Sequence, residues 1–257
     1  MVNELLHEGI NSRHCIQMEA KVRCFNSSCI CKVLLSGFES LTTYKNIIME
    51  LPFTKEEIIT AVGIHPLKVK DIFIYGSRVY GSAKEHSDYD FAFVSGNLLP
   101  HEEKRLNING IKLNVHVYTP DVFKEALAKH DIMNLECVFA PEWAIMQEKS
   151  AYSREINKKK LVKNNLTQSK ASWGNAKLKI YDGDIIKGQK GLFHSLRMLM
   201  FAAQIIEHGK IVDFSVGNTL YEEIMDCDEF DWRYYSDKYL PLKVQLEDKL
   251  KSLVGEE

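Results

Sequence analysis

The chain has 257 residues, a formal net charge of −2, and ordinary hydrophobic (45%) and charged (26%) fractions. This length allows one large domain or two modest ones, and the charge argues against a strongly basic nucleic-acid binder, although basic residues can still gather locally. No apolar run reaches the ~20 residues that cross a bilayer. Charged residues also interrupt the N-terminal stretch where a signal peptide needs an apolar segment. We therefore expect a cytoplasmic protein.

The first 48 residues have no sustained periodicity and are interpreted as an N-terminal extension of unknown structure. Four of the six cysteines lie in it: Cys15, Cys24, Cys29 and Cys31. With His14 nearby, the last three could form a zinc site, but their spacing differs from the paired ligand knuckles of zinc proteins. Reduced thiols of a cytosolic protein are the favoured interpretation.

The next stretch predicts a helix followed by a strand. The helix should run from about Lys55 to Val62, since Thr54 and Glu57 have the spacing of a capping box and Gly63 supplies a stop. An apolar strand is predicted from Val69 to Tyr75.

Two carboxylates and a glycine–serine pair stand close to that strand. Gly76 and Ser77 follow it directly, and Asp88 and Asp90 precede a second apolar strand, Phe91–Val94. Alternate residues of a strand point to one face, so the two carboxylates converge and could bind Mg²⁺. A glycine lets the backbone approach a ligand closely, and N–H groups after a strand can bind phosphate. The pattern suggests nucleotide chemistry; a plain turn containing Asp is the alternative.

A third strand is predicted from Ile111 to Tyr118, where apolar and polar residues alternate. Its polar face offers Asn114 and His116. The dipeptide Asn109-Gly110 before it is a hairpin turn signal.

Helices are expected to dominate the remainder. One is predicted from Pro120 to about Lys129, and a partly apolar segment, Met133–Met146, should pack on the sheet. A loop is expected around Asp182–Gly188. The strongest helix is Gln189–His208, whose apolar stripe recurs at helical spacing, and a last amphipathic helix spans roughly Pro241–Leu253.

The glycine–serine pair, a ten-residue gap and Asp88-Tyr89-Asp90 together resemble the signature of the DNA polymerase β-like nucleotidyltransferase superfamily. The motif Ser-Asp-Tyr-Asp and the preceding segment Gly-Ser-Arg-Val-Tyr-Gly-Ser are similar to the sequences of its small prokaryotic-type branch. Members with a similar signature include minimal nucleotidyltransferases, aminoglycoside nucleotidyltransferases and protein-adenylylating antitoxins. The resemblance implies an α+β fold, with a mixed β-sheet flanked by helices at residues 49–150 and an α-helical domain at 151–257.

The resemblance also implies an activity and its residues. Asp88 and Asp90 would bind Mg²⁺ and act in transferring a nucleoside monophosphate from an NTP, with ATP expected, to a hydroxyl acceptor. The residues expected to bind the nucleotide are Gly76, Ser77, Arg78, Ser87 and Arg197. The acceptor could be a small molecule, a protein side chain or an RNA end.

The chain departs from the family at the strand Ile111–Tyr118, where the superfamily usually carries a third carboxylate. Here Asn114 and His116 stand instead. With an unperturbed pKa near 6.5, His116 is a candidate base, or else an ordinary polar strand residue. Glu136 is a candidate for the missing carboxylate. The departure motivates an alternative function: a nucleotide-binding or antitoxin-like regulatory protein with a degenerate site.

Two interpretations of the second half stay open. The basic run Lys158–Lys163 could belong to an RNA-modifying enzyme, which steep salt dependence of RNA binding would support. Lys170, Lys177 and Trp173 could grip phosphate and stack a base. In the alternative, Trp173 is a core residue and the lysines are solvated.

Overall fold

The computed structural model describes residues 51–96, 99 and 101–255. All of them belong to one compact unit. The extension predicted at residues 1–48, with its cysteine cluster, lies outside the described residues. Among the helices of the described part, none is long and apolar enough to cross a membrane.

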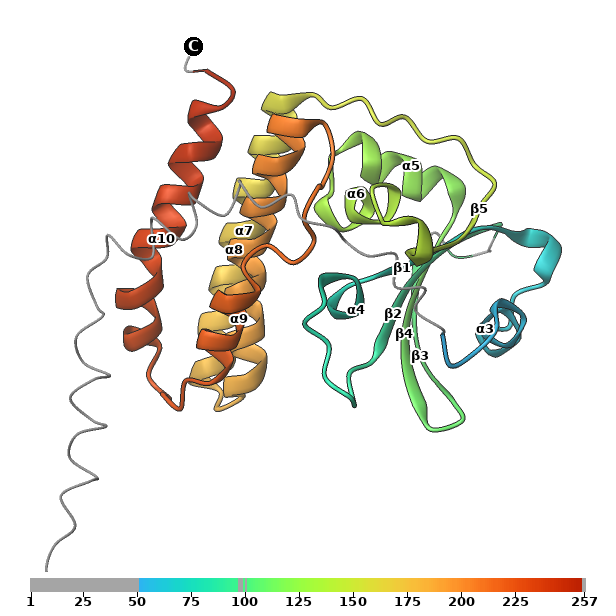
Figure 1. Cartoon of the computed structure of the whole chain (residues 1–257), viewed down its shortest axis with the longest axis horizontal. Coiled ribbons are helices and arrows are strands. Elements are labelled where there is room, and N and C mark those ends of the chain that lie inside the picture. Colours follow the sequence, from blue (N-terminus) through green and yellow to red (C-terminus); the bar gives the residue numbers. More distant parts are fainter. Residues whose placement is uncertain (1–50, 97–98, 100, 256–257) are drawn as a thin grey trace, which may run out of the picture. The chain divides into compact units, whose positions relative to one another are not determined.

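Five strands form a mixed sheet in the order β3-β4-β2-β1-β5 (Figure 1). The strands are β1 (Val69–Tyr75), β2 (Tyr89–Ser95), β3 (His101–Ile108), β4 (Ile111–Tyr118) and β5 (Ile145–Glu148). β2 and β4 run parallel, and every other neighbouring pair is antiparallel. The three predicted strands are confirmed, and the ends of the first and third match the prediction.

Helices cover both faces of the sheet. On one face, Phe53 of the segment leading into α3 (Lys55–Val62) packs against Phe91, with ring centroids 5.8 Å apart. On the other, Phe73 stacks on Phe123 of α5 (Pro120–Ala128) at 5.9 Å, and α6 (Ile132–Val138) also packs against β1. Short 3-10 turns lie at Pro66–Lys68 and Glu142–Ala144. A one-turn helix, α4 (Ser77–Tyr80), follows β1.

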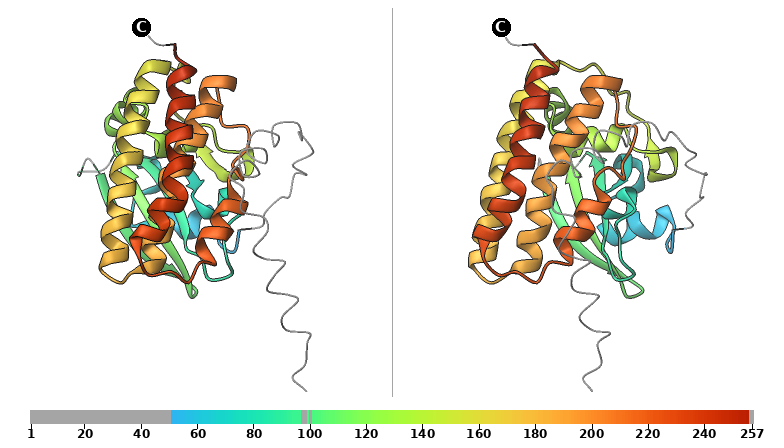
Figure 2. Two further views of the ribbon diagram at one scale, coloured as in Figure 1. Left: turned by 90° about the vertical axis from the view of Figure 1, so that its left-hand side faces the viewer. Right: turned by 60° about the vertical axis from the view of Figure 1, so that its left-hand side comes forward.

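The C-terminal half is helical, with α7 (Lys158–Tyr181), α8 (Ile185–His208), α9 (Asn218–Met225) and α10 (Trp232–Ser252) (Figure 2). The first two are antiparallel neighbours, joined by hydrogen bonds such as that from Ser169 Oγ to the Ser195 carbonyl (2.8 Å). Buried side chains of the sheet and of three of these helices form one continuous hydrophobic core. The fold is therefore α+β, as the resemblance implied. The division at about residue 150 stays a prediction.

The local signals for caps and turns are confirmed. Thr54 and Glu57 make a reciprocal capping box, and Gly63 ends α3 in the left-handed region at φ 75°. Asn109 (φ 52°) and Gly110 (φ 88°) turn the chain between β3 and β4, because a tight hairpin needs positive φ at both positions.

Three elements differ from the prediction. The strand β3 was not predicted, because its half-buried face is apolar only at Leu106 and Ile108. The first half of that face is charged: Lys104 donates to the Val62 carbonyl (2.9 Å) and lies 3.6 Å from Glu102. Helix α8 begins earlier than expected, with Lys187 and Gly188 inside it, because Asp184 caps it. Helix α10 begins at Trp232 and contains Pro241.

A buried carboxylate ties the start of β1 to the segment after β5. Asp71 is fully buried, and its Oδ1 accepts hydrogen bonds from the backbone N–H groups of Lys149 (2.7 Å) and Ser150 (2.9 Å). Its Oδ2 accepts from the hydroxyl groups of Ser150 (2.6 Å) and Tyr152. Four donors satisfy this buried charge, and they anchor the strand that leads to Gly76.

We expect Asp71→Ala to lower the free energy of unfolding by about 3 kcal/mol, because it leaves four partly buried donors without their acceptor. Urea denaturation measures the loss. The control is Asp237→Ala on α10, whose ion pair with Arg233 is solvent-exposed, so its effect should stay within about 0.5 kcal/mol. Equal losses in the two variants would contradict this assignment.

Candidate active site

The backbone between β1 and α4 adopts a conformation that is essentially reserved for glycine. Gly76 has φ 78° and ψ −155° and precedes Ser77, the first residue of α4. The carbonyl of Gly76 accepts the N–H groups of Val79 (2.9 Å) and Tyr80 (3.0 Å). Gly76 and Ser77, the predicted phosphate-binding residues, thus form a sharp turn from β1 into α4, and we call this turn the cradle.

Gly76 also lies against the carboxylate of Asp90. A Cβ at position 76 would be 2.4 Å from Asp90 Oδ2 and 3.2 Å from its Cγ. Side chains do not approach so closely, so a residue other than glycine would displace the carboxylate. The cradle and the carboxylate therefore form one packed unit.

The two aspartates differ in their surroundings. Asp90 lies on β2, paired with Tyr75 of β1 on one side and Asn114 of β4 on the other, and it is half-buried. Asp88 precedes β2 and is exposed. Asp88 lies just outside the strand, so the convergence of the two carboxylates stays a prediction, but the charge of Asp88 acts on Asp90.

Burial sets the acidity of Asp90. It raises the pKa of this carboxyl group to about 6, and the negative charge of Asp88 raises it as well. A hydrogen bond from Asn114 Nδ2 to Asp90 Oδ1 (3.3 Å) and the positive charge of Lys190 act in the opposite direction. A bound cation would stabilise the ionised form of a carboxylate that is partly buried and lies near a second negative charge.

Asn114 occupies the position opposite Asp90 on the neighbouring parallel strand. Its Oδ1 is buried, and the described residues supply no hydrogen-bond donor to it. An oxygen donor set of two carboxylates and one amide fits Mg²⁺, which prefers oxygen ligands. Within the described ranges, no group of three or more His, Cys, Asp and Glu side chains is placed to hold a metal ion.

Arg78 and Ser87, both predicted to bind nucleotide, hold the loop that leads to Asp88. The Arg78 guanidinium lies 4.1 Å from the ring centroid of Tyr89, and its Nη2 donates to the Ser87 carbonyl (2.7 Å). The Ser87 hydroxyl accepts the N–H of Lys84 (2.8 Å). These bonds fix the approach to Asp88, and direct contact with a nucleotide stays a prediction.

His116 lies two residues beyond Asn114 on the same face of β4, opposite Ala92. Its Nδ1 is 3.0 Å from His101 Nε2, and its ring lies edge-on to Tyr75, with centroids 6.2 Å apart. Burial, followed by the charge of His101, lowers its pKa, so the ring is neutral at pH 7. Its role as a base stays a prediction.

Glu136, considered as a replacement carboxylate, does not join the aspartates. It is 3% exposed on α6 and accepts a hydrogen bond from the Tyr80 hydroxyl. Burial raises its pKa to about 8. Arg197 is also buried, with its guanidinium over the rings of Tyr80 (4.4 Å) and Phe193 (4.3 Å), so a phosphate contact for it stays a prediction.

Sequence reasoning missed Lys190, which is exposed on α8 and whose charge acts on Asp90. The signal was present, because Lys190, His194 and Arg197 recur at spacings of four and three and share one helix face. Trp173 is half-buried and packs edge-on against Trp232 of α10, with ring centroids 5.2 Å apart, so both interpretations of Trp173 stay predictions.

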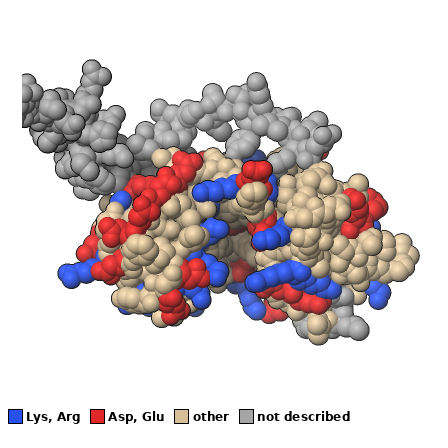
Figure 3. Space-filling view, turned by 90° about the horizontal axis from the view of Figure 1, so that it is seen from below, with Lys and Arg blue, Asp and Glu red and all other residues tan. Residues whose placement is uncertain are grey.

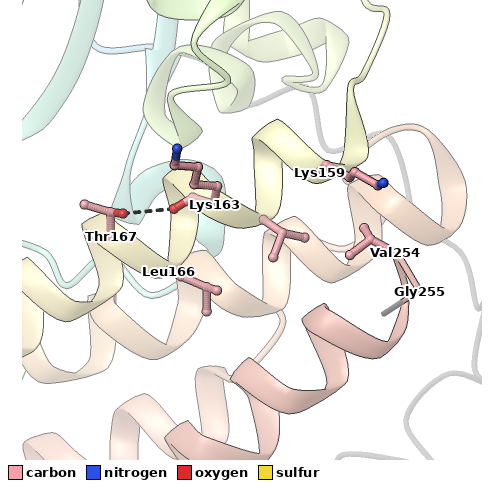
Figure 4. A pocket seen from close by; sticks show the side chains of 7 residues that line it. Lys159, Lys163, Leu166, Thr167, Val254 and Gly255 are labelled. Carbon is pink, nitrogen blue, oxygen red and sulfur yellow. Dashed lines mark hydrogen bonds between the residues drawn. The ribbon is translucent and has the colours of Figure 1, made fainter. Parts of the chain in front are cut away.

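The surface is hollowed between the helices α7–α10 and the sheet, with Lys and Arg side chains on both sides of the hollow (Figure 3). A separate, open hollow of about 570 Å³ lies between the N-terminal half of α7 and the end of the chain after α10 (Figure 4). The residues that line it include Lys159, Lys163 and Val254. The aspartates do not line this second hollow, so we do not assign it to the candidate site.

We expect Gly76→Ala to lower the free energy of unfolding by about 3 kcal/mol, because the new methyl group meets Asp90 in a conformation that alanine rarely adopts. The matched control is Gly63→Ala, which has a similar φ of 75° but no atom within 4 Å of the added Cβ. The control should lose only about 1 kcal/mol. Urea denaturation compares them, and equal losses would argue against the close packing of Gly76 and Asp90.

Residues 55–163 match the family model described as the nucleotidyltransferase domain. No curated protein sequence matches the chain. Among solved structures, ten chains match. One is a nucleotidyltransferase-like protein from Exiguobacterium sibiricum 255-15, at 14% identity and a TM-score of 0.31, covering 77% of this chain and 74% of that one. So distant a structural likeness carries no argument by itself, and the assignment depends on the family model and the signature. Residues 55–163 of this chain are a nucleotidyltransferase domain of the DNA polymerase β-like superfamily.

Proposed function

We propose that the protein transfers a nucleoside monophosphate from a nucleoside triphosphate, with ATP as the first candidate, to a hydroxyl acceptor. One observation carries the proposal: the Asp90 carboxylate is packed against the Gly76 backbone, accepts a hydrogen bond from Asn114 Nδ2, and lies within the electrostatic influence of Asp88. A triphosphate at the turn would thereby meet cation-binding oxygens at the same point. The nucleotidyltransferase domain supports a general nucleotidyl transfer activity.

Magnesium is the proposed cofactor, with Asp88 and Asp90 as carboxylate ligands and Asn114 Oδ1 as a third oxygen. When bound, Mg²⁺ would neutralise triphosphate charge and help to align the reacting groups. Gly76 and Ser77 would contact the phosphates through backbone and hydroxyl donors at the start of α4. Lys190 would add a positive charge from the helical side, since its field already acts on Asp90.

In the proposed reaction, the acceptor oxygen forms a bond to the α-phosphorus while the bond from that phosphorus to the bridging oxygen breaks. Pyrophosphate leaves with the bonding electron pair. The hydroxyl proton passes to a base, for which His116 is the candidate, because its neutral ring lies on the same face of the sheet as Asp90 and Asn114.

A second candidate function follows from Asn114. An amide in place of a carboxylate opposite Asp90 reduces the negative charge available to cations, so the protein could bind a nucleotide without fast turnover, as an antitoxin-like regulator would. Calorimetry with ATP and Mg²⁺ separates the two functions. Tight binding without turnover on any acceptor would favour the regulator.

The acceptor class and the compartment stay predictions. Small molecules, protein hydroxyl groups and RNA ends are the acceptors to test, and a cytoplasmic location is proposed from the sequence. The basic run at the start of α7 makes RNA one arm of that test, and its binding should weaken steeply with salt.

We expect the double variant Asp88→Ala/Asp90→Ala to lose pyrophosphate release from labelled ATP, by about 100-fold or more, because both proposed carboxylate ligands are removed. The wild-type protein is incubated with Mg²⁺ and each acceptor class in parallel. The control, Asp182→Ala, changes an exposed carboxylate between α7 and α8. Pyrophosphate release that survives the double change would refute the proposed function.

Mg²⁺ affinity should fall below about pH 6, by about tenfold per pH unit, because the metal must displace the proton that the raised pKa of Asp90 retains. Titration of Mg²⁺ binding from pH 5 to 8 measures this dependence. Asn114→Asp should move the midpoint upward, since a second carboxylate would face Asp90 directly. An unchanged midpoint in that variant would contradict the assigned electrostatics.

The same shift has a stability signature in the metal-free protein. The folded-state pKa of Asp90 is about 6, above its ordinary value of 3.8, because the folded protein favours the protonated carboxyl group. Protonated Asp90 therefore adds to the free energy of unfolding below about pH 4, and this stabilisation is lost as pH rises through about 6. Asp90→Asn should therefore be the more stable protein at pH 7, and this advantage should vanish near pH 4.

A further inference from the structure

Helix α4, which begins at the predicted cradle, cannot hold its own position. It has four residues, and an isolated turn of helix is unstable because its few hydrogen bonds do not offset the entropy of ordering it. Its backbone bonds end with the N–H of Ser82 donating to the Ser77 carbonyl (3.0 Å). Contacts from elsewhere in the molecule must therefore fix the orientation of Gly76 and Ser77.

Those contacts converge on the last residue of α4, Tyr80. From α9, Asn218 Nδ2 donates to the Tyr80 backbone carbonyl (2.8 Å), which the short helix leaves without an intrahelical partner. From α6, Glu136 accepts the Tyr80 hydroxyl hydrogen bond. From α8, Phe201 packs on the Tyr80 ring, with centroids 5.7 Å apart.

Arg197 of α8 joins these contacts into one cluster. Its guanidinium lies 4.4 Å from the Tyr80 ring centroid, and its Nη2 donates to Asn218 Oδ1. Asn218 thus accepts a hydrogen bond from Arg197 and donates another to the Tyr80 carbonyl. Arg197 is only 3% exposed, so the cluster is largely shielded from water, where each polar contact matters more.

The cluster lies at the opposite end of α4 from Ser77. Arg197 therefore contacts the end of α4 away from the turn: its Nη2 bonds to Asn218, while its buried Nε has no hydrogen-bond partner among the described residues. Within the described residues these contacts link α4 to α6, α8 and α9, none of which follows it directly in the chain.

We propose that Arg197 and Asn218 are positioning residues, which hold α4 and through it Gly76 and Ser77 in the geometry that receives the triphosphate. In this assignment Arg197 acts through Tyr80 and Asn218 and does not touch the phosphates. The part of the assignment that concerns the triphosphate rests on the proposed function.

The first experiment needs no ligand. In the full-length protein, Asn218→Ala should speed hydrogen exchange of the Val79 and Tyr80 amides of α4, and of the Ser82 amide just after it, by about fivefold, the factor that one lost hydrogen bond gives. The matched control is Asn164→Ala, because Asn164 Nδ2 also donates to a backbone carbonyl, that of His130 (3.1 Å), away from α4. The control should leave these amides unchanged. Wild-type exchange in Asn218→Ala would overturn the proposal.

The second experiment measures affinity for ATP with Mg²⁺ by calorimetry. Asn218→Ala should bind ATP about fivefold more weakly, and Asn164→Ala within about twofold of wild type. Equal weakening in both variants would overturn the positioning of the cradle. A wild-type protein that binds no ATP would refute the proposed function instead, and the exchange experiment would still decide whether the cluster holds α4.

A third comparison tests Arg197 itself. If Arg197 positions α4, Arg197→Lys should weaken ATP binding as much as Arg197→Met, because lysine lacks the planar group that lies on Tyr80 while bonding Asn218. Wild-type affinity in the lysine variant with a large loss in the methionine variant would identify a charge contact to phosphate and overturn the assignment. If neither variant folds, Asn218→Ala decides.

Discussion

The contact between the Asp90 carboxylate and the Gly76 backbone is the constraint on which the rest of the site depends. A carboxylate can come this close only to a residue without a side chain, and only because that residue adopts φ 78°. The contact places Asp90 of β2 beside Gly76, which directly follows β1. The acidity of Asp90 follows, because the same packing that excludes a methyl group also excludes water from one side of the carboxylate.

The sheet determines which groups can meet there. The parallel pairing of β2 with β4 sets Asn114 opposite Asp90 and His116 opposite Ala92, so the amide and the imidazole lie at successive positions along one face. Asp71 fixes the far end of β1 with four donors, so the strand that leads to Gly76 is anchored at both ends. Buried polar groups thus define the geometry, while the hydrophobic core supplies most of the stability.

Sequence reasoning succeeded where local chemistry decides structure. Thr54 and Glu57 cap a helix through neighbours three residues apart, and Asn109-Gly110 turns a hairpin through its own backbone preferences. It missed β3, because only Leu106 and Ile108 of its half-buried face are apolar and the other two positions are the charged Glu102 and Lys104. The aspartate pair was singled out from its spacing together with the neighbouring Gly-Ser pair, and its role stays a prediction; Lys190 was not singled out, because its relation to Asp90 depends on how α8 lies beside the sheet. Tertiary packing overrides local pattern in each missed case.

The two charged residues on the inner face of β3, Glu102 and Lys104, have a consequence for how the protein behaves at high concentration. β3 is the outermost strand of the sheet, and an edge strand presents unpaired backbone groups that can recruit a strand from another molecule. An incoming strand would have to continue a face on which Glu102 and Lys104 point inward, with their charges paired to each other. The opposite edge, β5, has only four residues. Both edges of the described sheet are thereby poor templates for intermolecular strand pairing.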